Sequence, residues 1–164
     1  SFAPDILIGD GYSEVEARSV TSLFMWVSLV SAPLGGRVIE VLGHMTATII
    51  VMTAFSAVGM MAIAYGMATE VSFVVVGITL GVAVGALMSL SSEAVSPENR
   101  GPGLGIFYTW YYIGMTISPM IAGWTKDMTG ITSAPVMLAA GMLVVTIICV
   151  GLFRLLQKTW PITT

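Results

Sequence analysis

The sequence contains 164 residues, of which 56% are hydrophobic and only 9% are charged, and its mean hydropathy is +0.94. Soluble domains carry about 25% charged residues, so a chain this apolar along its whole length does not fit one soluble core and predicts several helices facing lipid. The six Lys and Arg residues are scattered singly and the net charge is −3, which excludes a basic patch for nucleic acid. The single cysteine, Cys149, excludes an internal disulfide and a thiolate metal cluster.

Five long apolar runs, separated by short polar or glycine-containing turns, follow a short N-terminal segment, SFAPDILIG. Each run has about 20 residues, which at about 1.5 Å per residue matches a hydrocarbon core of about 30 Å. The short alternating strands of a membrane barrel are missing from the sequence. We therefore predict an all-α integral membrane fold, a single transmembrane domain over residues 1–164. It consists of an N-terminal helix stub and five antiparallel transmembrane helices at about residues 13–34, 46–65, 72–92, 101–124 and 133–153.

The first predicted span begins with a capping box. Ser13 lies three residues before Glu16, so its hydroxyl can accept from the Glu16 amide while the Glu16 carboxylate accepts from the Ser13 amide. Glu14 and Arg18 are four residues apart in the order that favours an ion pair on a helix. We interpret the later segment PLGGRVIEVLGHM as a short polar break between the first two spans.

Basic residues are unequally divided between the two ends of the predicted bundle. Because cytoplasmic loops of membrane proteins carry an excess of Lys and Arg, the end with more of them is expected to be cytoplasmic. That end holds four basic residues, Arg37, Arg100, Arg154 and Lys158, and the opposite end holds two, Arg18 and Lys126. We therefore expect an integral protein of the plasma or inner membrane with its C-terminus in the cytoplasm.

One predicted span carries a stripe of glycines. Gly77, Gly81 and Gly85 recur every four residues and so lie on one face of the helix at 72–92. Stripes of small residues let the backbones of two membrane helices approach closely. Close packing is the favoured interpretation of this stripe, and contact with a solute is the alternative.

The segment GRVIEVLGHM, residues 36–45, resembles the cytoplasmic signature loop of the major facilitator superfamily, Gly-x-Leu-Ala-Asp-Arg-x-Gly-Arg-Arg. Gly36 and Gly43 fall on its two glycines, Glu40 falls on its acidic position, and Arg37 lies in the same loop. The positions where the family usually has basic residues are occupied by Val41, His44 and Met45.

The segment Ser96–Gly130 resembles the eleventh span of the same superfamily. The residues that carry this resemblance are Pro97, Arg100, Gly101, Gly114, Pro119, Gly123, Asp127 and Gly130. The resemblance then covers the whole chain, as the end of span seven and spans eight to twelve. It implies a secondary transporter that moves a small solute by alternating access. This chain would be the C-terminal half and would not be competent without the missing N-terminal six-helix half.

The family places the solute cavity between its two halves, and the helix at 101–124 supplies the best candidates to line it. Tyr108, Tyr111, Tyr112 and Met115 fall on one helical face. They lie about two turns inside the span, where polar rings need a partner or water. Plain helix–helix packing is the alternative for this face. Weaker candidates on other spans are Trp26, Ser28 and Thr79.

The resemblance implies two further roles. Pro119 removes a backbone hydrogen bond and, with Gly114 nearby, is a candidate gating bend, with a static kink as the alternative. The signature loop, Arg100 and Gly101 are candidates for a cytoplasmic latch, because a carboxylate such as Glu40 is stabilised near a helix N-terminus of the opposite half. A solvated loop charge is the alternative for Glu40.

A non-transporting membrane scaffold or assembly subunit is the alternative to a transporter. An enzyme is not expected, because the sequence lacks a Gly-x-Ser-x-Gly motif, a pair of metal-binding histidines and an intramembrane acidic dyad. We expect no cofactor and no metal. The expected partners are the lipid bilayer, the missing half and an unidentified small-molecule solute, with no nucleic acid. Because SFAPDILIG resembles the tail of a longer apolar helix, we expect the chain to be a fragment.

Overall fold

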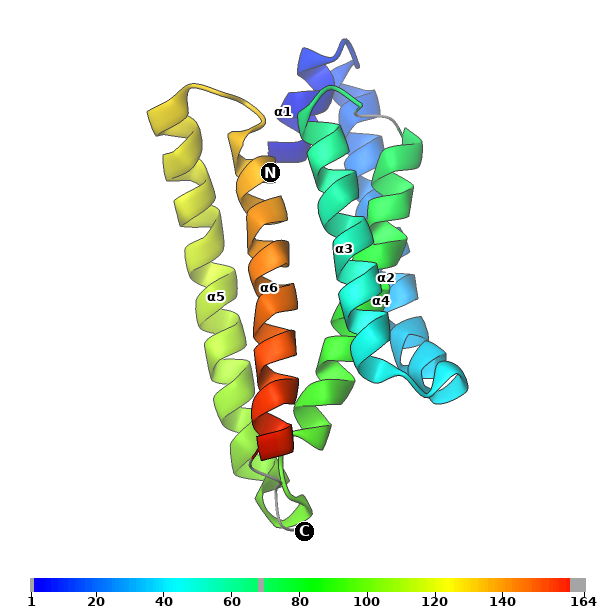
Figure 1. Ribbon diagram of the computed structural model, residues 1–164. Helices are drawn as coiled ribbons and strands as arrows, with labels where there is room; N and C mark the ends of the chain where they lie inside the picture. Colours follow the sequence, from blue (N-terminus) through cyan, green and yellow to red (C-terminus); the bar gives the residue numbers. More distant parts are fainter. Residues whose placement is uncertain (1, 68–69, 160–164) are drawn as a thin grey trace.

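The computed structural model describes residues 2–67 and 70–159. Figure 1 shows long helices running up and down beside one another, with a short N-terminal helix at one end of the bundle. No strand occurs in the described residues, which confirms the predicted all-α membrane fold. The elements are α1 (Phe2–Gly9), α2 (Glu14–Leu42), α3 (Met45–Ala64), α4 (Glu70–Glu93), the 3-10 turn η1 (Pro97–Asn99), α5 (Arg100–Thr129) and α6 (Ala134–Thr159).

Four helices in the described part of the chain are long and apolar enough to cross a membrane, namely α2, α3, α4 and α6. α5 is the longest helix, with 30 residues, but it is not among them. Its glycines, tyrosines and tryptophans make it less apolar than its neighbours. Because α5 runs beside α6 in Figure 1, it passes through the same layer as the more apolar helices.

The predicted end of the first span at residue 34 is wrong. α2 continues to Leu42, and Pro33, Gly35 and Gly36 all lie inside it. Tertiary packing explains the difference, because a Cβ added to Gly35 would meet the backbone of α4. Gly35 therefore serves a close helix contact, and neither it nor Gly36 ends the helix. Gly43, with a φ of 66°, forms the C-terminal cap.

The other predicted spans differ from the observed helices mainly at their ends. Residues 46–65 and 72–92 correspond closely to α3 and α4, whereas α5 and α6 extend beyond the predictions to Thr129 and Thr159. The capping box is present as predicted: the Ser13 amide donates to the Glu16 carboxylate at 2.9 Å, and the Glu16 amide donates to the Ser13 hydroxyl at 3.3 Å. The predicted Glu14–Arg18 ion pair also forms, at 3.3 Å.

α2 and α4 form the closest helix pair in the bundle. The glycine stripe of α4 faces α2, and a Cβ added to Gly81 would lie 2.6 Å from the carbonyl oxygen of Ser28. The Ser31 hydroxyl donates across the same interface to the carbonyl of Gly77 at 3.2 Å. Close packing is therefore confirmed as the role of this stripe.

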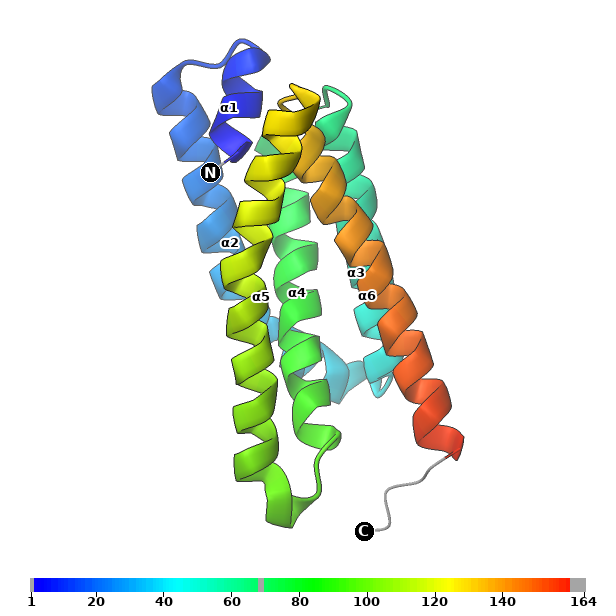
Figure 2. The same cartoon turned by 90° about the vertical axis from the view of Figure 1, so that its left-hand side faces the viewer.

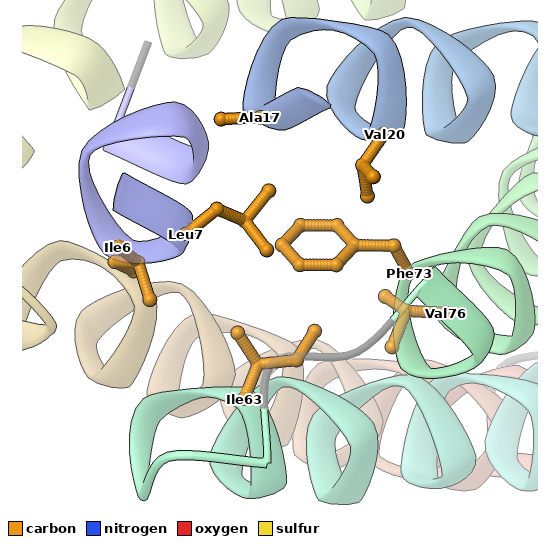
Figure 3. Close-up of a cluster of buried hydrophobic side chains, with 7 residues drawn as sticks. All are labelled: Ile6, Leu7, Ala17, Val20, Ile63, Phe73 and Val76. Carbon is orange, nitrogen blue, oxygen red and sulfur yellow. The ribbon is translucent and has the colours of Figure 1, made fainter. Parts of the chain in front are cut away.

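α1 is anchored at the upper end of the bundle by an apolar cluster. Figure 3 shows Ile6 and Leu7 of α1 among side chains from α2, α3 and α4, and Leu7 is fully buried. The other buried members of the cluster are Ala17, Val20, Ile63, Phe73 and Val76. This contact fixes the position and the direction of α1 relative to the long helices.

Arg154 of α6 joins three helices at the opposite end of the bundle. Its guanidinium donates to the Glu93 carboxylate of α4 at 3.0 Å and to the Thr46 hydroxyl of α3 at 2.7 Å. It also donates to the Gln157 side chain at 2.7 Å. A planar guanidinium suits such a role because its donors point in several fixed directions.

Candidate functional site

α5 is the least covered helix of the bundle. None of its residues, all of which the structure describes, is buried. It contacts α6 and, to a smaller extent, α4. α5 and α6 cross at an angle, because they separate toward the upper end in Figure 1 and toward the lower end in Figure 2. The large apolar or aromatic side chains that α5 exposes most are Ile106, Trp110, Tyr112, Met120, Trp124 and Met128.

Three tyrosines of α5 form one aromatic cluster. The ring centroid of Tyr108 lies 6.5 Å from that of Tyr111 and 6.4 Å from that of Tyr112. The Tyr111 and Tyr112 centroids are 5.5 Å apart. These separations are typical of edge-to-face and offset aromatic pairs. The structure thus brings together the three tyrosines that sequence analysis assigns to one helical face, and Tyr112 is the most exposed of them, at 62%.

A pocket of about 870 Å³ lies beside α5, and we call it the α5 pocket. Tyr111 and Met115 line it, whereas Tyr108 and Tyr112 do not. None of the described residues that line it is charged. In the described part of the chain, no three His, Cys, Asp or Glu side chains lie close enough to hold a metal ion. The pocket is lined by Ala3, Met60, Trp110, Tyr111, Gly114, Met115, Ser118, Pro119, Ala122, Pro135, Val136, Leu138, Ala139 and Met142.

Both residues of the predicted bend also line the α5 pocket. α5 is continuous through Gly114 and Pro119, although Pro119 has no amide hydrogen to donate to the preceding turn. The Ser118 hydroxyl donates a hydrogen bond to the Gly114 carbonyl oxygen at 2.7 Å. Both groups belong to the turn that precedes Pro119. The two residues therefore lie where a change in the shape of α5 would change the shape of the pocket.

Trp26 and Thr79 are not brought to the α5 pocket. Trp26 is exposed on α2. Thr79 lies between α3 and α4, where its hydroxyl accepts a hydrogen bond from Ser56 at 2.9 Å and donates to the Val75 carbonyl at 2.9 Å. In this structure Thr79 therefore contributes to helix contacts.

The signature-loop residues and the start of α5 share one end of the bundle, the lower end in Figure 1. Arg37 and Glu40 are exposed in the last turns of α2, and Arg100 and Gly101 are exposed at the start of α5. Among the described residues Glu40 forms no ion pair. Asn99, which precedes α5, makes no side-chain bond to the first helical amides. η1 leads directly into α5, and Pro102 in the first turn of α5 has no amide hydrogen.

An ion pair between α1 and α5 was not identified from the sequence. The Lys126 ammonium lies 2.7 Å from the Asp5 carboxylate, although 121 residues separate them. The available signal was that both residues belong to the same predicted end of the bundle. Which charges pair at that end depends on how the helices pack, so no local pattern reveals it.

Comparison with protein-family models gives a match to the Major Facilitator Superfamily over residues 1–162. The searches among curated proteins and among solved structures gave no significant match. The family match includes both segments that carry the resemblance, residues 36–45 and 96–130, and the bundle of apolar helices agrees with it. On this evidence the chain belongs to the major facilitator superfamily of membrane transporters.

Proposed function

We propose that this chain forms the C-terminal half of a secondary transporter that moves a small solute by alternating access. One observation carries the proposal: the longest helix, α5, has no buried residue and exposes a cluster of tyrosines. If every uncovered side of α5 faced lipid, the tyrosine hydroxyls would have no hydrogen-bonding partner there. The exposed face of α6 shows the contrast, because it is built from apolar residues, which include Val144, Val145, Ile148, Leu152 and Leu155.

We assign solute contact to Tyr108 and Tyr112. Both lie outside the α5 pocket and keep substantial exposed area, 40% and 62%. Their rings are stacked, with centroids 6.4 Å apart, so they form one continuous surface with hydroxyl groups. A second half of the transporter on this side of α5 would enclose the tyrosine surface and create a water-containing path between the halves.

Uptake by the full-length protein tests this assignment. Sealed vesicles are exposed to a panel of radiolabelled small solutes, and Tyr108→Ala and Tyr112→Ala are measured with any solute that accumulates. Each variant removes a stacking surface and a hydrogen-bonding group worth about 1 kcal/mol, so KM should rise roughly three- to tenfold.

Trp124→Ala is the control, because it removes an exposed ring of the same helix outside both the tyrosine cluster and the α5 pocket. Accumulation of no solute would contradict transport. An unchanged KM in both tyrosine variants would contradict the assigned solute contact.

We further propose that Glu40 and the start of α5 form two parts of a cytoplasmic latch. Glu40 would face a helix N-terminus of the other half, and the start of α5, the positive end of its helix dipole, would receive an acidic residue from that half. A favourable contact of this kind is worth about 0.3–1 kcal/mol when exposed. Glu40→Gln should therefore shift the balance between inward-open and outward-open states by up to about fivefold. Cysteine labelling from each side of the membrane measures that balance, and identical labelling in wild type and variant would reject the latch.

The end of the bundle that carries Glu40 and the start of α5 also indicates how the protein is oriented in the membrane. Arg37, Arg100 and Arg154 lie near the end that Figure 1 shows at the bottom, so we assign this end to the cytoplasm. A tag at the C-terminus should resist protease in intact cells and be cleaved after lysis. Cleavage in intact cells would show that the C-terminus lies outside the cell and would contradict this orientation.

A further inference from the structure

We propose that the solute in contact with the tyrosine surface, Tyr108 and Tyr112, is a weakly hydrated organic cation such as a quaternary ammonium ion. This assignment rests on the transport function proposed above and names the class of its solute. Three properties of the chain point to that class: exposed aromatic ring faces, spans without charged or carboxamide side chains, and an acidic outer end.

The tyrosine surface presents ring faces to whatever lies beside α5. Tyr112 is 62% exposed and Tyr108 is 40% exposed, and the planes of their rings are inclined by 30°. The face of an aromatic ring is negative, and a cation within about 6 Å of the ring centroid is attracted to it. Because the two centroids are 6.4 Å apart, one cation can lie within that distance of both rings.

The membrane-spanning parts of the helices carry no charge that could pair with a strongly hydrated ion. No charged residue occurs in residues 19–36, 45–64, 71–92, 101–125 or 134–153. The only carboxamide side chains of the sequence, Asn99 and Gln157, lie outside these ranges. A phosphate, a carboxylate, a sodium ion or a sugar would therefore find no charge and no carboxamide on these helices to replace its water. A quaternary ammonium ion holds its water weakly and needs no such partner.

The basic residues at the two ends of α5 lie far from the tyrosines. Arg100 precedes Tyr108 by eight residues and Lys126 follows Tyr112 by 14, which at about 1.5 Å per residue is roughly 12 Å and 21 Å along the helix axis. Both distances exceed the Debye length of about 8 Å at physiological ionic strength. In a water-containing path, neither residue repels a cation strongly or holds an anion at the tyrosines. The rings therefore decide which charge is preferred there.

The end of the bundle opposite the assigned cytoplasmic end, the upper end in Figure 1, is acidic. It has two basic residues against six exposed acidic ones, a formal charge of −4, whereas the lower end has four basic residues against three acidic ones, a formal charge of +1. A negative surface concentrates cations and repels anions. The six acidic residues are Asp5, Asp10, Glu14, Glu16, Glu70 and Asp127.

A neutral solute of the same shape is the competing class. It would cover the same area of the two rings, but it would gain neither the attraction to their faces nor the higher concentration at the acidic end. A cation and its uncharged isostere therefore differ only in the property that the proposal concerns.

Equilibrium binding to the full-length protein in lipid nanodiscs tests the charge of the solute. The cationic probes are choline and benzyltrimethylammonium. Their neutral isosteres, 3,3-dimethylbutan-1-ol and neopentylbenzene, have carbon in place of the ammonium nitrogen, and phenylmethanesulfonate is an anion of similar size. Empty nanodiscs correct for partition into lipid. At least one cation should bind roughly tenfold or more tightly than its isostere, and the anion should bind more weakly than either cation. Equal affinity within each pair, tighter binding of the anion, or binding of neither cation overturns the proposal.

Fluorination of the ring at position 112 tests contact between the cation and the ring face. Tyr112→Phe keeps that face, and 3,4,5-trifluorophenylalanine in place of Tyr112 keeps the shape of the ring but withdraws electron density from the face. Affinity for the cationic probe should fall roughly two- to thirtyfold from the first variant to the second, whereas affinity for the neutral isostere should not change. The same two substitutions at Tyr65, an exposed tyrosine after α3, are the matched control and should leave both affinities unchanged. Equal affinity of the two Tyr112 variants for the cation would overturn the assigned contact.

Binding and uptake fail in different ways. If the full-length protein accumulates a neutral or anionic solute and binds neither cation, transport stands and the cationic class is overturned. If the protein binds a cation with the expected preference but accumulates no solute, the site for a cation stands and transport is contradicted.

Discussion

Gly85→Ala is expected to destabilise the protein by about 3 kcal/mol or more, at the upper end of the cost of overpacking a tight interface. The added Cβ would collide with the backbone carbonyl of Ala32 in α2, and a backbone atom cannot rotate away as a side chain can. α2 and α4 would have to separate, and the closest helix pair of the bundle would be lost. Thermal unfolding in detergent micelles measures the effect as a large fall in Tm.

Gly141→Ala on α6 is the matched control, because nothing lies within 4 Å of its added Cβ. Alanine has a helix propensity about 1 kcal/mol better than glycine, so this variant should be neutral or slightly stabilising. A Tm of Gly85→Ala equal to that of Gly141→Ala would contradict the close α2–α4 contact.

Arg154→Met is expected to cost about 1–2 kcal/mol of stability. The change removes the hydrogen bonds that join α6 to Glu93 of α4 and to Thr46 of α3. Hydrogen bonds to charged groups contribute about 1.5–3 kcal/mol to stability. The expected cost lies near the lower end of this range because the Glu93 side chain is 45% exposed and solvent weakens the pair. Arg154→Lys should recover little of the stability that Arg154→Met loses, because an ammonium cannot reproduce the planar set of donors of the guanidinium.

A double-mutant cycle with Glu93→Gln isolates the pairwise part of this cost. Because Glu93 and Arg154 touch directly, the two single changes should not add, and the double variant should be more stable than their sum predicts. Additive losses in Tm would show that Glu93 and Arg154 act independently.

Features set by local sequence were predictable. The capping box at Ser13 and the ion pair of Glu14 with Arg18 depend on residues within one helical turn, and both form as predicted. The glycine stripe on α4 was also readable, because its four-residue spacing alone defines a helix face. The tyrosines of α5 were placed on one face by the same periodicity.

Features that depend on packing between distant segments were not predictable. Gly35 and Gly36 after Pro33 are typical of a helix end, yet α2 continues because α4 packs closely against Gly35. The pairing of Asp5 with Lys126 depends on how α1 lies against α5. Periodicity grouped Tyr111 with Tyr108, but it could not show that Tyr111 lines the α5 pocket while Tyr108 does not.

Water access to the tyrosine surface of α5 tests the central proposal most directly. In the full-length protein with Cys149→Ser, which removes the exposed native thiol, Tyr112→Cys and Ile148→Cys are treated with a membrane-impermeant maleimide in vesicles opened to both sides. Ile148 is exposed on the apolar face of α6 and serves as the lipid-facing reference. If Tyr112 lines a solute path, Tyr112→Cys should react much faster than Ile148→Cys. Equal, slow reaction at both positions would place the tyrosine surface in lipid or in a dry interface and contradict a solute path along α5.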